Sequence, residues 1–139
     1  MTHQHSYTSD LASLMKDICH VPAALNTYVS GLSIDSRSVQ KGDLFLALSG
    51  SRSESTDHIV EAVNKGANAV VVEGSLFDGR VFEDGMAVEL FVDSLKEKAG
   101  EIADRFFRSP SKDVDVIGVT GTNGKTSVST FIRQIWEEL

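Results

Sequence analysis

The sequence predicts an α/β fold: a small N-terminal α/β domain with a mixed or mainly parallel sheet, followed by a strand, a phosphate-binding loop (P-loop) and a helix. Three observations support this prediction. Apolar, β-branched runs alternate with helical periodicity up to about residue 109. Ser109-Pro110-Ser111-Lys112 then breaks the pattern as a connector. Beyond it, a glycine-rich segment joins an apolar run to an amphipathic helix. We therefore divide the chain into domains 1–109 and 110–139.

The N-terminal domain is expected to open with a short amphipathic helix, which Thr8 or Ser9 caps. The apolar stripe of this helix consists of Leu11, Leu14, Met15 and Ile18. Runs rich in β-branched or aromatic residues predict the strands that follow. These runs are 28–34, 44–48, 69–72 and 88–92.

Helices are expected between and after these strands. One covers about 58–65 and ends at Gly66, which suits a helix C-terminus. Another begins after Ser94, because Ser94 and Glu97 have the spacing of a capping box. Residues 73–86 are rich in Gly and Asp without a clear period, so we expect a surface excursion there.

Composition narrows the possible partners. The 139 residues carry a net charge of −7 with a pI near 5.0, so nucleic acid or an anionic membrane gains no electrostatic attraction. Cys19 is the single cysteine, which excludes an internal disulfide and fits a reducing compartment. No apolar run has the length of a transmembrane helix. We expect a cytoplasmic protein with neither nucleic-acid nor membrane partners.

The segment after the connector has the pattern of a phosphate-binding unit. An apolar run at 114–119 predicts a buried strand, and Gly121 and Gly124 then predict a tight loop before a helix. Loop amides and the helix N-terminus would bind an anion. Lys125 would place a charge on the β- and γ-phosphates as the catalytic residue, and the Thr126 hydroxyl would bind Mg²⁺.

This segment departs from the general P-loop pattern, which places a glycine where Val119 stands. The alternative interpretation is a glycine-rich loop that only turns the chain. The apolar run before the loop, the Gly124-Lys125-Thr126 junction and the helical pattern after it favour nucleotide binding.

Two polar segments of the N-terminal domain are further candidates. Asp35, Ser36 and Arg37 leave the end of a predicted strand together, offering a carboxylate, a hydroxyl and a guanidinium. Residues 49–57 form a polar loop with Arg52 directly before a helix, which suits another anion. From the residues alone, a satisfied turn and an ordinary solvated loop remain the alternatives.

Taken in order, four segments resemble the beginning of a Mur ligase. They are Ile34–Arg37, Lys41–Gly50, Gly66-Ala67 and Gly118–Thr126, and the similarity runs from about residue 32 to the end of the chain. The form Thr120-Gly-Thr-Asn-Gly-Lys-Thr126 is similar to the branch of the family that adds the third residue of the stem peptide. The resemblance implies an N-terminal domain that binds the substrate's UDP end and the start of a central ATPase domain.

The resemblance also implies site residues by matching position. Ile34 and Ser36 would contact the uridine, and Ser51, Arg52 and Ser53 the nucleotide-sugar. The ATP phosphates would be wrapped by Gly121, Thr122, Asn123, Gly124, Lys125, Thr126 and Ser127. The sequence departs from the family after the polar loop, where an Asp-Gly and an aromatic residue are usual. Glu54-Ser55 and His58 stand there instead.

The implied reaction uses ATP to phosphorylate the side-chain carboxylate of D-glutamate in UDP-MurNAc-L-Ala-D-Glu. An amine of meso-diaminopimelate or L-lysine then attacks the acyl phosphate. Because the second domain is begun and not completed, we expect a fragment that is inactive by itself and that could self-associate through 114–139. Two alternatives stay open: a P-loop NTPase or kinase of another family, and a non-catalytic nucleotide-sugar-binding module.

Overall fold

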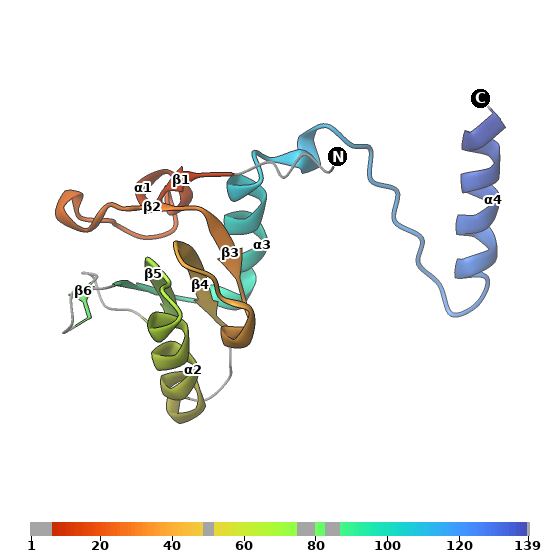
Figure 1. The fold of residues 1–139 in the computed structure, drawn as a ribbon. Coiled ribbons are helices and arrows are strands. Elements are labelled where there is room, and N and C mark those ends of the chain that lie inside the picture. The colour runs from red at the N-terminus through yellow and green to blue at the C-terminus, as the bar shows by residue number, and fades with distance from the viewer. Residues whose placement is uncertain (1–6, 49–51, 75–79, 83–86, 139) are drawn as a thin grey trace. The chain divides into compact units, whose positions relative to one another are not determined.

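The computed structural model describes residues 7–48, 52–74, 80–82 and 87–138 (Figure 1). The chain separates into two compact units, Met1–Ser109 and Pro110–Leu139. The first unit contains the sheets and most of the helices. The second contains an extended segment and one long helix.

The central sheet of the first unit has five strands in the order β3-β4-β5-β7-β6. Four of them are parallel, with Phe45 opposite Val70 between β4 and β5, and β6 joins the edge antiparallel to β7. The strands are β3 (Gly31–Ser33), β4 (Asp43–Ala47), β5 (Ala69–Glu73), β6 (Arg80–Val81) and β7 (Val88–Val92). A separate antiparallel pair joins β1 (Ser9–Asp10) and β2 (Tyr28–Val29). The predicted α/β fold with a mixed sheet is confirmed.

Helices cover both faces of this sheet, because its strands are apolar on both sides. Leu44 and Leu46 point into a core shared with α1 (Leu11–Leu14) and α3 (Leu95–Phe106). Phe45 and Ala47, which alternate with them, pack on the opposite face with α2 (Arg52–Asn64). Figure 1 shows α2 and α3 at opposite sides of the sheet.

Both predicted helix caps were wrong. Asp10 caps α1, accepting a hydrogen bond from the Ser13 amide at 3.0 Å, while Ser9 lies in β1 and pairs with Val29 of β2. At α3, Ser94 has a left-handed backbone (φ 56°) and its side chain makes no capping bond. The Glu73 carboxylate at the end of β5 accepts from the Ser94 and Leu95 amides instead, at 2.6 and 2.8 Å.

Two predicted boundaries also moved. Helix α2 begins at Arg52, six residues before the predicted start, because a polar first turn carries no apolar periodicity. Strand β6 lies inside the predicted surface excursion 73–86, of which 75–79 and 83–86 are outside the described residues.

The second unit consists of a 3₁₀ turn η3 (Pro110–Lys112), an extended segment and α4 (Lys125–Glu138). The strand predicted at 114–119 was wrong: within the described residues it pairs with no other strand, so no ladder forms. None of residues 110–138 is buried. Across the described part of the chain, each helix is too short or too polar to span a bilayer.

Candidate functional site

The turn that follows β3 carries the first candidate site. This 3₁₀ turn, η2 (Ser36–Ser38), lies at the carboxyl end of a parallel strand, where α/β sheets bind ligands. Ile34 is 65% exposed in front of the turn, whereas Ser36 is 3% exposed. The two residues predicted to contact uridine therefore face different surroundings.

Asp35 shapes the start of η2. Its side chain accepts from the Arg37 amide at 3.0 Å and, through both oxygens, from Arg37 Nε at 3.0 Å and Nη2 at 2.7 Å. The hydrogen bonds and charge of Arg37 lower the pKa of Asp35 to about 2. The same contacts raise the pKa of Arg37. Asp35 is thus a capping carboxylate that is ionised at neutral pH.

Ser36 is turned toward helix α2. Its hydroxyl donates to Glu61 Oε2 at 2.5 Å and lies 3.2 Å from His58 Nδ1. Because a serine hydroxyl has one hydrogen and Glu61 accepts it, the contact with His58 needs a proton on Nδ1. The bonds from Ser36 and then Lys65 lower the pKa of Glu61, which keeps this carboxylate charged.

Lys65 completes this contact between the turn and the helix. Its ammonium donates to the Ser36 carbonyl at 3.1 Å, to the Arg37 carbonyl at 2.8 Å and to Glu61 Oε1 at 2.9 Å. Glu61 and Lys65 were not predicted as site residues from the sequence. Their four-residue spacing indicated a helical ion pair, but no local pattern indicated that the pair reaches η2.

The loop predicted to contact the nucleotide-sugar is described only in part. Ser51 lies outside the described residues, while Arg52 and Ser53 form the first turn of α2. The same helix carries Glu61, and Lys65 follows directly after its end, so α2 connects this segment to the contacts with η2. The roles assigned to Ile34, Ser36 and Ser51–Ser53 stay predictions.

The glycine-rich loop forms the second candidate site. Gly121 and Gly124 have φ of 150° and 77°, values that residues with a Cβ rarely adopt. Helix α4 begins directly after Gly124, and the Val128 amide makes the first helical bond, to the Gly124 carbonyl at 2.9 Å. The preceding amides of the helix have no helical acceptor, as an anion site requires.

Lys125 folds back over this loop, where its ammonium donates to the Gly121 carbonyl at 2.7 Å. The predicted phosphate contact would require this bond to break, so that the side chain turns outward. Thr126 is exposed on the first turn of α4. Among the described residues, no group of three or more His, Cys, Asp or Glu side chains could hold a metal ion.

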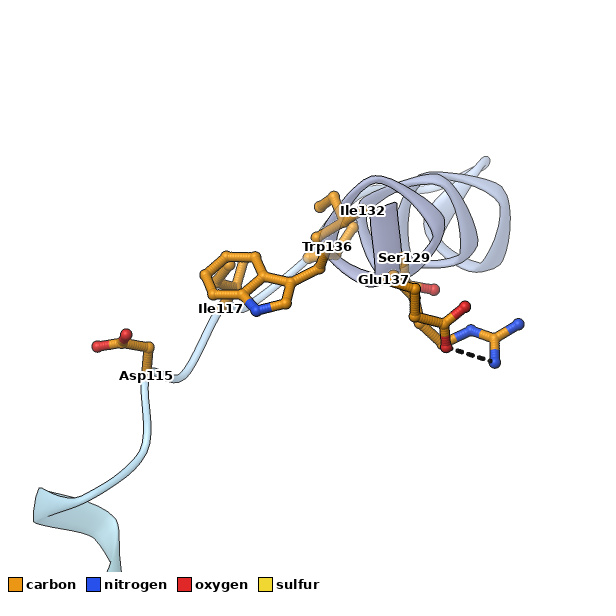
Figure 2. Close-up of a pocket in the computed structure, with 8 residues that line it drawn as sticks. Asp115, Ile117, Ser129, Ile132, Trp136 and Glu137 are labelled. Carbon is orange, nitrogen blue, oxygen red and sulfur yellow. Dashed lines mark hydrogen bonds and ion pairs between the residues drawn. The ribbon is translucent and has the colours of Figure 1, made fainter. Parts of the chain in front are cut away.

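A cavity of about 330 Å³ in the second unit lies apart from the glycine-rich loop. It opens between the extended segment and α4, and Figure 2 shows Trp136 directed toward the segment that carries Ile117. The lining residues are Asp115, Ile117, Val119, Ser129, Ile132, Arg133, Trp136 and Glu137. Because Gly121–Ser127 do not line it, this cavity is not the predicted phosphate site.

Comparison with known families and sequences gives consistent results. The model of the Mur ligase family, catalytic domain, matches residues 28–106. The chain is 40% identical over 129 residues to UDP-N-acetylmuramoyl-L-alanyl-D-glutamate–2,6-diaminopimelate ligase of Xylella fastidiosa, which covers 93% of this chain and 25% of that protein. The enzyme of the same name from Pseudomonas aeruginosa is 44% identical over 103 residues, 74% of this chain and 21% of that protein.

The chain thus spans about a quarter of the length of these curated relatives. The 129 aligned residues exceed the 109 of the first unit, so the similarity includes residues of both units. Among solved structures, UDP-N-acetylmuramoylalanyl-D-glutamyl-2,6-diaminopimelate–D-alanyl-D-alanyl ligase from Acinetobacter baumannii matches with a TM-score of 0.63 and 22% identity. The match covers 99% of this chain and 30% of that one, and at this identity it supports the fold alone.

Proposed function

Because this chain belongs to the Mur ligase family, we propose that it carries the nucleotide-sugar site and the phosphate loop of an ATP-dependent amide-forming ligase. The substrate of this ligase is UDP-MurNAc-L-Ala-D-Glu, to which it adds a diamino acid in peptidoglycan synthesis. One observation carries the proposal: the similarity to 2,6-diaminopimelate ligases extends over both units. The names of these relatives favour meso-diaminopimelate over L-lysine as the added residue.

In the first unit, the nucleotide end of the substrate would bind at the carboxyl end of β3. Ile34 is exposed there for an apolar contact with the uridine, and the η2 turn lies beside it. Arg52, at the start of α2, provides a charge of the sign that a diphosphate attracts. We assign Ser51 and Ser53 to the same ligand, whereas the Ser36 hydroxyl donates to Glu61 and helps to shape the turn.

In the second unit, the ATP phosphates would be bound by Gly121–Ser127. The free amides at the start of α4 and the positive φ of Gly124 fit such a ligand. Thr126 would offer a hydroxyl to Mg²⁺, an ion that usually keeps several waters and takes its other ligands from phosphates or carboxylates. Lys125 would leave the Gly121 carbonyl to neutralise charge on the transferred phosphoryl group.

The reaction proceeds in two transfers. A carboxylate oxygen of the substrate's D-glutamate attacks the γ-phosphorus of ATP, and ADP leaves. The amine of the diamino acid then attacks the acyl carbon, and phosphate leaves while the amine loses a proton. We expect the 139-residue chain by itself to bind its ligands without turnover, so ADP release from the purified chain would contradict this expectation.

Binding to the purified chain tests the proposal. We expect UDP-MurNAc-L-Ala-D-Glu and ATP each to shift amide resonances, the first in the first unit and the second around Gly121–Ser127. Lys125→Ala should abolish the ATP response and leave the UDP-sugar response unchanged. Lys112→Ala, which removes a lysine from the connector, is the matched control. ATP binding without any UDP-sugar response would instead favour a P-loop NTPase of another family.

Self-association is a separate part of the proposal. Val116, Phe131 and Ile135 are more than half exposed on the second unit, and apolar surface of this kind favours association. Sedimentation velocity should show a concentration-dependent species that the double substitution Phe131→Ser, Ile135→Ser removes. A monomer at all concentrations would contradict it. We expect the protein in the cytoplasm, as the single cysteine indicates.

A further inference from the structure

Side chains at the C-terminal end of helix α2 form hydrogen bonds to three atoms of the η2 turn. Glu61 lies in the last turn of α2 and Lys65 follows directly after the helix, with its amide still bonded to the Glu61 carbonyl at 3.0 Å, so the two side chains project from the same side. The Glu61 carboxylate accepts a hydrogen bond from the Ser36 hydroxyl, and the Lys65 ammonium donates to the carbonyls of Ser36 and Arg37. We name Glu61 and Lys65 the α2 clamp.

The α2 clamp holds a surface turn more than it holds the core. Its ion pair is partly solvated, with side chains 35% and 40% exposed, and such pairs contribute little to global stability. Its hydrogen bonds go to η2, whose Arg37 side chain is 81% exposed. The main effect of these contacts is therefore local: they restrict the conformation of one turn.

The same contacts decide what the turn can offer a ligand. The Ser36 hydrogen is committed to Glu61, and its oxygen lies in a residue that is 3% exposed. Two residues earlier, Ile34 is 65% exposed. The clamp thus turns Ser36 inward and leaves Ile34 outward, on the side where the nucleotide would bind.

We propose that Glu61 and Lys65 are positioning residues of the nucleotide-sugar site, which hold η2 and the exposed Ile34 in the conformation that binds the uridine diphosphate end of the substrate. This inference rests on the proposed function. It assigns to Ser36 an anchoring role toward α2, through which the turn keeps its shape. Neither clamp residue touches the ligand.

The α3 helix provides a matched control. Glu101 and Arg105 form the same four-residue pair there, and Arg105 donates to the carbonyls of Leu14 and Lys16. This second pair, which we name the α3 clamp, holds α1 on the other face of the sheet. Breaking the α3 clamp should lower stability and leave UDP affinity unchanged, whereas breaking the α2 clamp should lower UDP affinity with a smaller effect on stability.

UDP binding to the 139-residue chain, measured by amide chemical shifts at a temperature where every variant is folded, tests the inference. We expect Lys65→Met to weaken UDP binding about tenfold or more, because two charge-assisted bonds to the turn are lost. Lys65→Arg should restore affinity, since a guanidinium can also donate to two carbonyls. Arg105→Met should leave UDP affinity unchanged.

A second readout follows the turn directly. In the free chain, amide hydrogen exchange at Arg37 and Ser38 should accelerate in Lys65→Met and stay unchanged in Arg105→Met. Unaltered UDP affinity in folded Lys65→Met, or an equal loss in Arg105→Met, would overturn the inference and leave the proposed function standing. Failure of the unsubstituted chain to bind UDP would overturn the proposed function, and the inference with it.

Discussion

The α2 clamp and the α3 clamp are built alike and act on different parts of the first unit. In each, an acidic residue of a helix pairs with a basic residue four positions later, which lies within α3 for Arg105 and directly after α2 for Lys65. The cation also donates to two backbone carbonyls of a distant segment. The α3 clamp reaches α1, whose Leu11 and Leu14 are in the core. The α2 clamp reaches η2, most of which lies at the surface.

The two clamps have the same kind of contacts, but one stabilises the fold and the other fixes the conformation of a surface turn. Arg105 is 24% exposed and holds an element that buries apolar side chains, so its bonds add to the burial that stabilises the fold. Lys65 is 35% exposed and holds a turn with little apolar burial of its own. The free energy of unfolding should therefore depend more on Arg105, and ligand affinity more on Lys65.

The largest effect on stability is expected from Arg105→Met. This change removes the bonds to Leu14 and Lys16 and leaves the part-buried Leu14 carbonyl and the exposed Lys16 carbonyl without this donor. We expect a loss of about 2 kcal/mol, which corresponds to a fall in melting temperature of roughly 8 °C. Thermal unfolding followed by circular dichroism measures it. A loss smaller than that of Lys65→Met would break the comparison between the clamps.

A smaller loss is expected at the start of α3, where Glu73→Ala removes the acceptor of the Ser94 and Leu95 amides. The cost should be about 1 kcal/mol, as for other helix caps. Glu97→Ala is the control, because Glu97 has the capping-box spacing in sequence, but no capping box with Ser94 forms among the described residues. It should change the free energy of unfolding by less than about 0.5 kcal/mol. A larger loss of stability in Glu97→Ala than in Glu73→Ala would show instead that Glu97 caps α3.

The smallest effect concerns pH at η2. The pKa of Asp35 is lowered to about 2, below its ordinary value of 3.8, so its ionised form is favoured in the folded state. Its contribution to stability is then present above pH 3.8 and is lost as the pH falls through about 2. A carbon-13 titration of the Asp35 carboxyl should show this midpoint, and Arg37→Met should raise it. A midpoint near 3.8 in both chains would show that the pair does not form in solution.

The strands and helices of the first unit could be predicted because each satisfies a local rule. Strand β5 is an uninterrupted apolar run, and α3 repeats its apolar residues at helical spacing. The caps and clamps could not, since their partners are far apart in sequence: Glu73 is 21 residues from Ser94, and Arg105 is 91 from Leu14. The apolar periodicity of a sequence does not indicate which carboxylate will lie beside which helix.

The candidate sites divide in the same way. The glycine loop and α4 were predicted from adjacent residues, and the structure places them together. The prediction of a strand at 114–119 was wrong, because an apolar run becomes a strand only where another strand is available to pair with it. At η2, the motif Asp35-Ser36-Arg37 indicated the place, while the inward direction of Ser36 depended on Glu61, 25 residues away.

The most direct test of a nucleotide-sugar site at η2 is a titration of the chain with UDP-MurNAc-L-Ala-D-Glu, followed by amide chemical shifts. We predict saturable shifts at residues 34–38 and in the first turn of α2, with α1 and the C-terminal half of α3 unchanged. Shifts confined to the α1 and α3 face, or none at η2 at saturating ligand, would contradict a binding site at this turn.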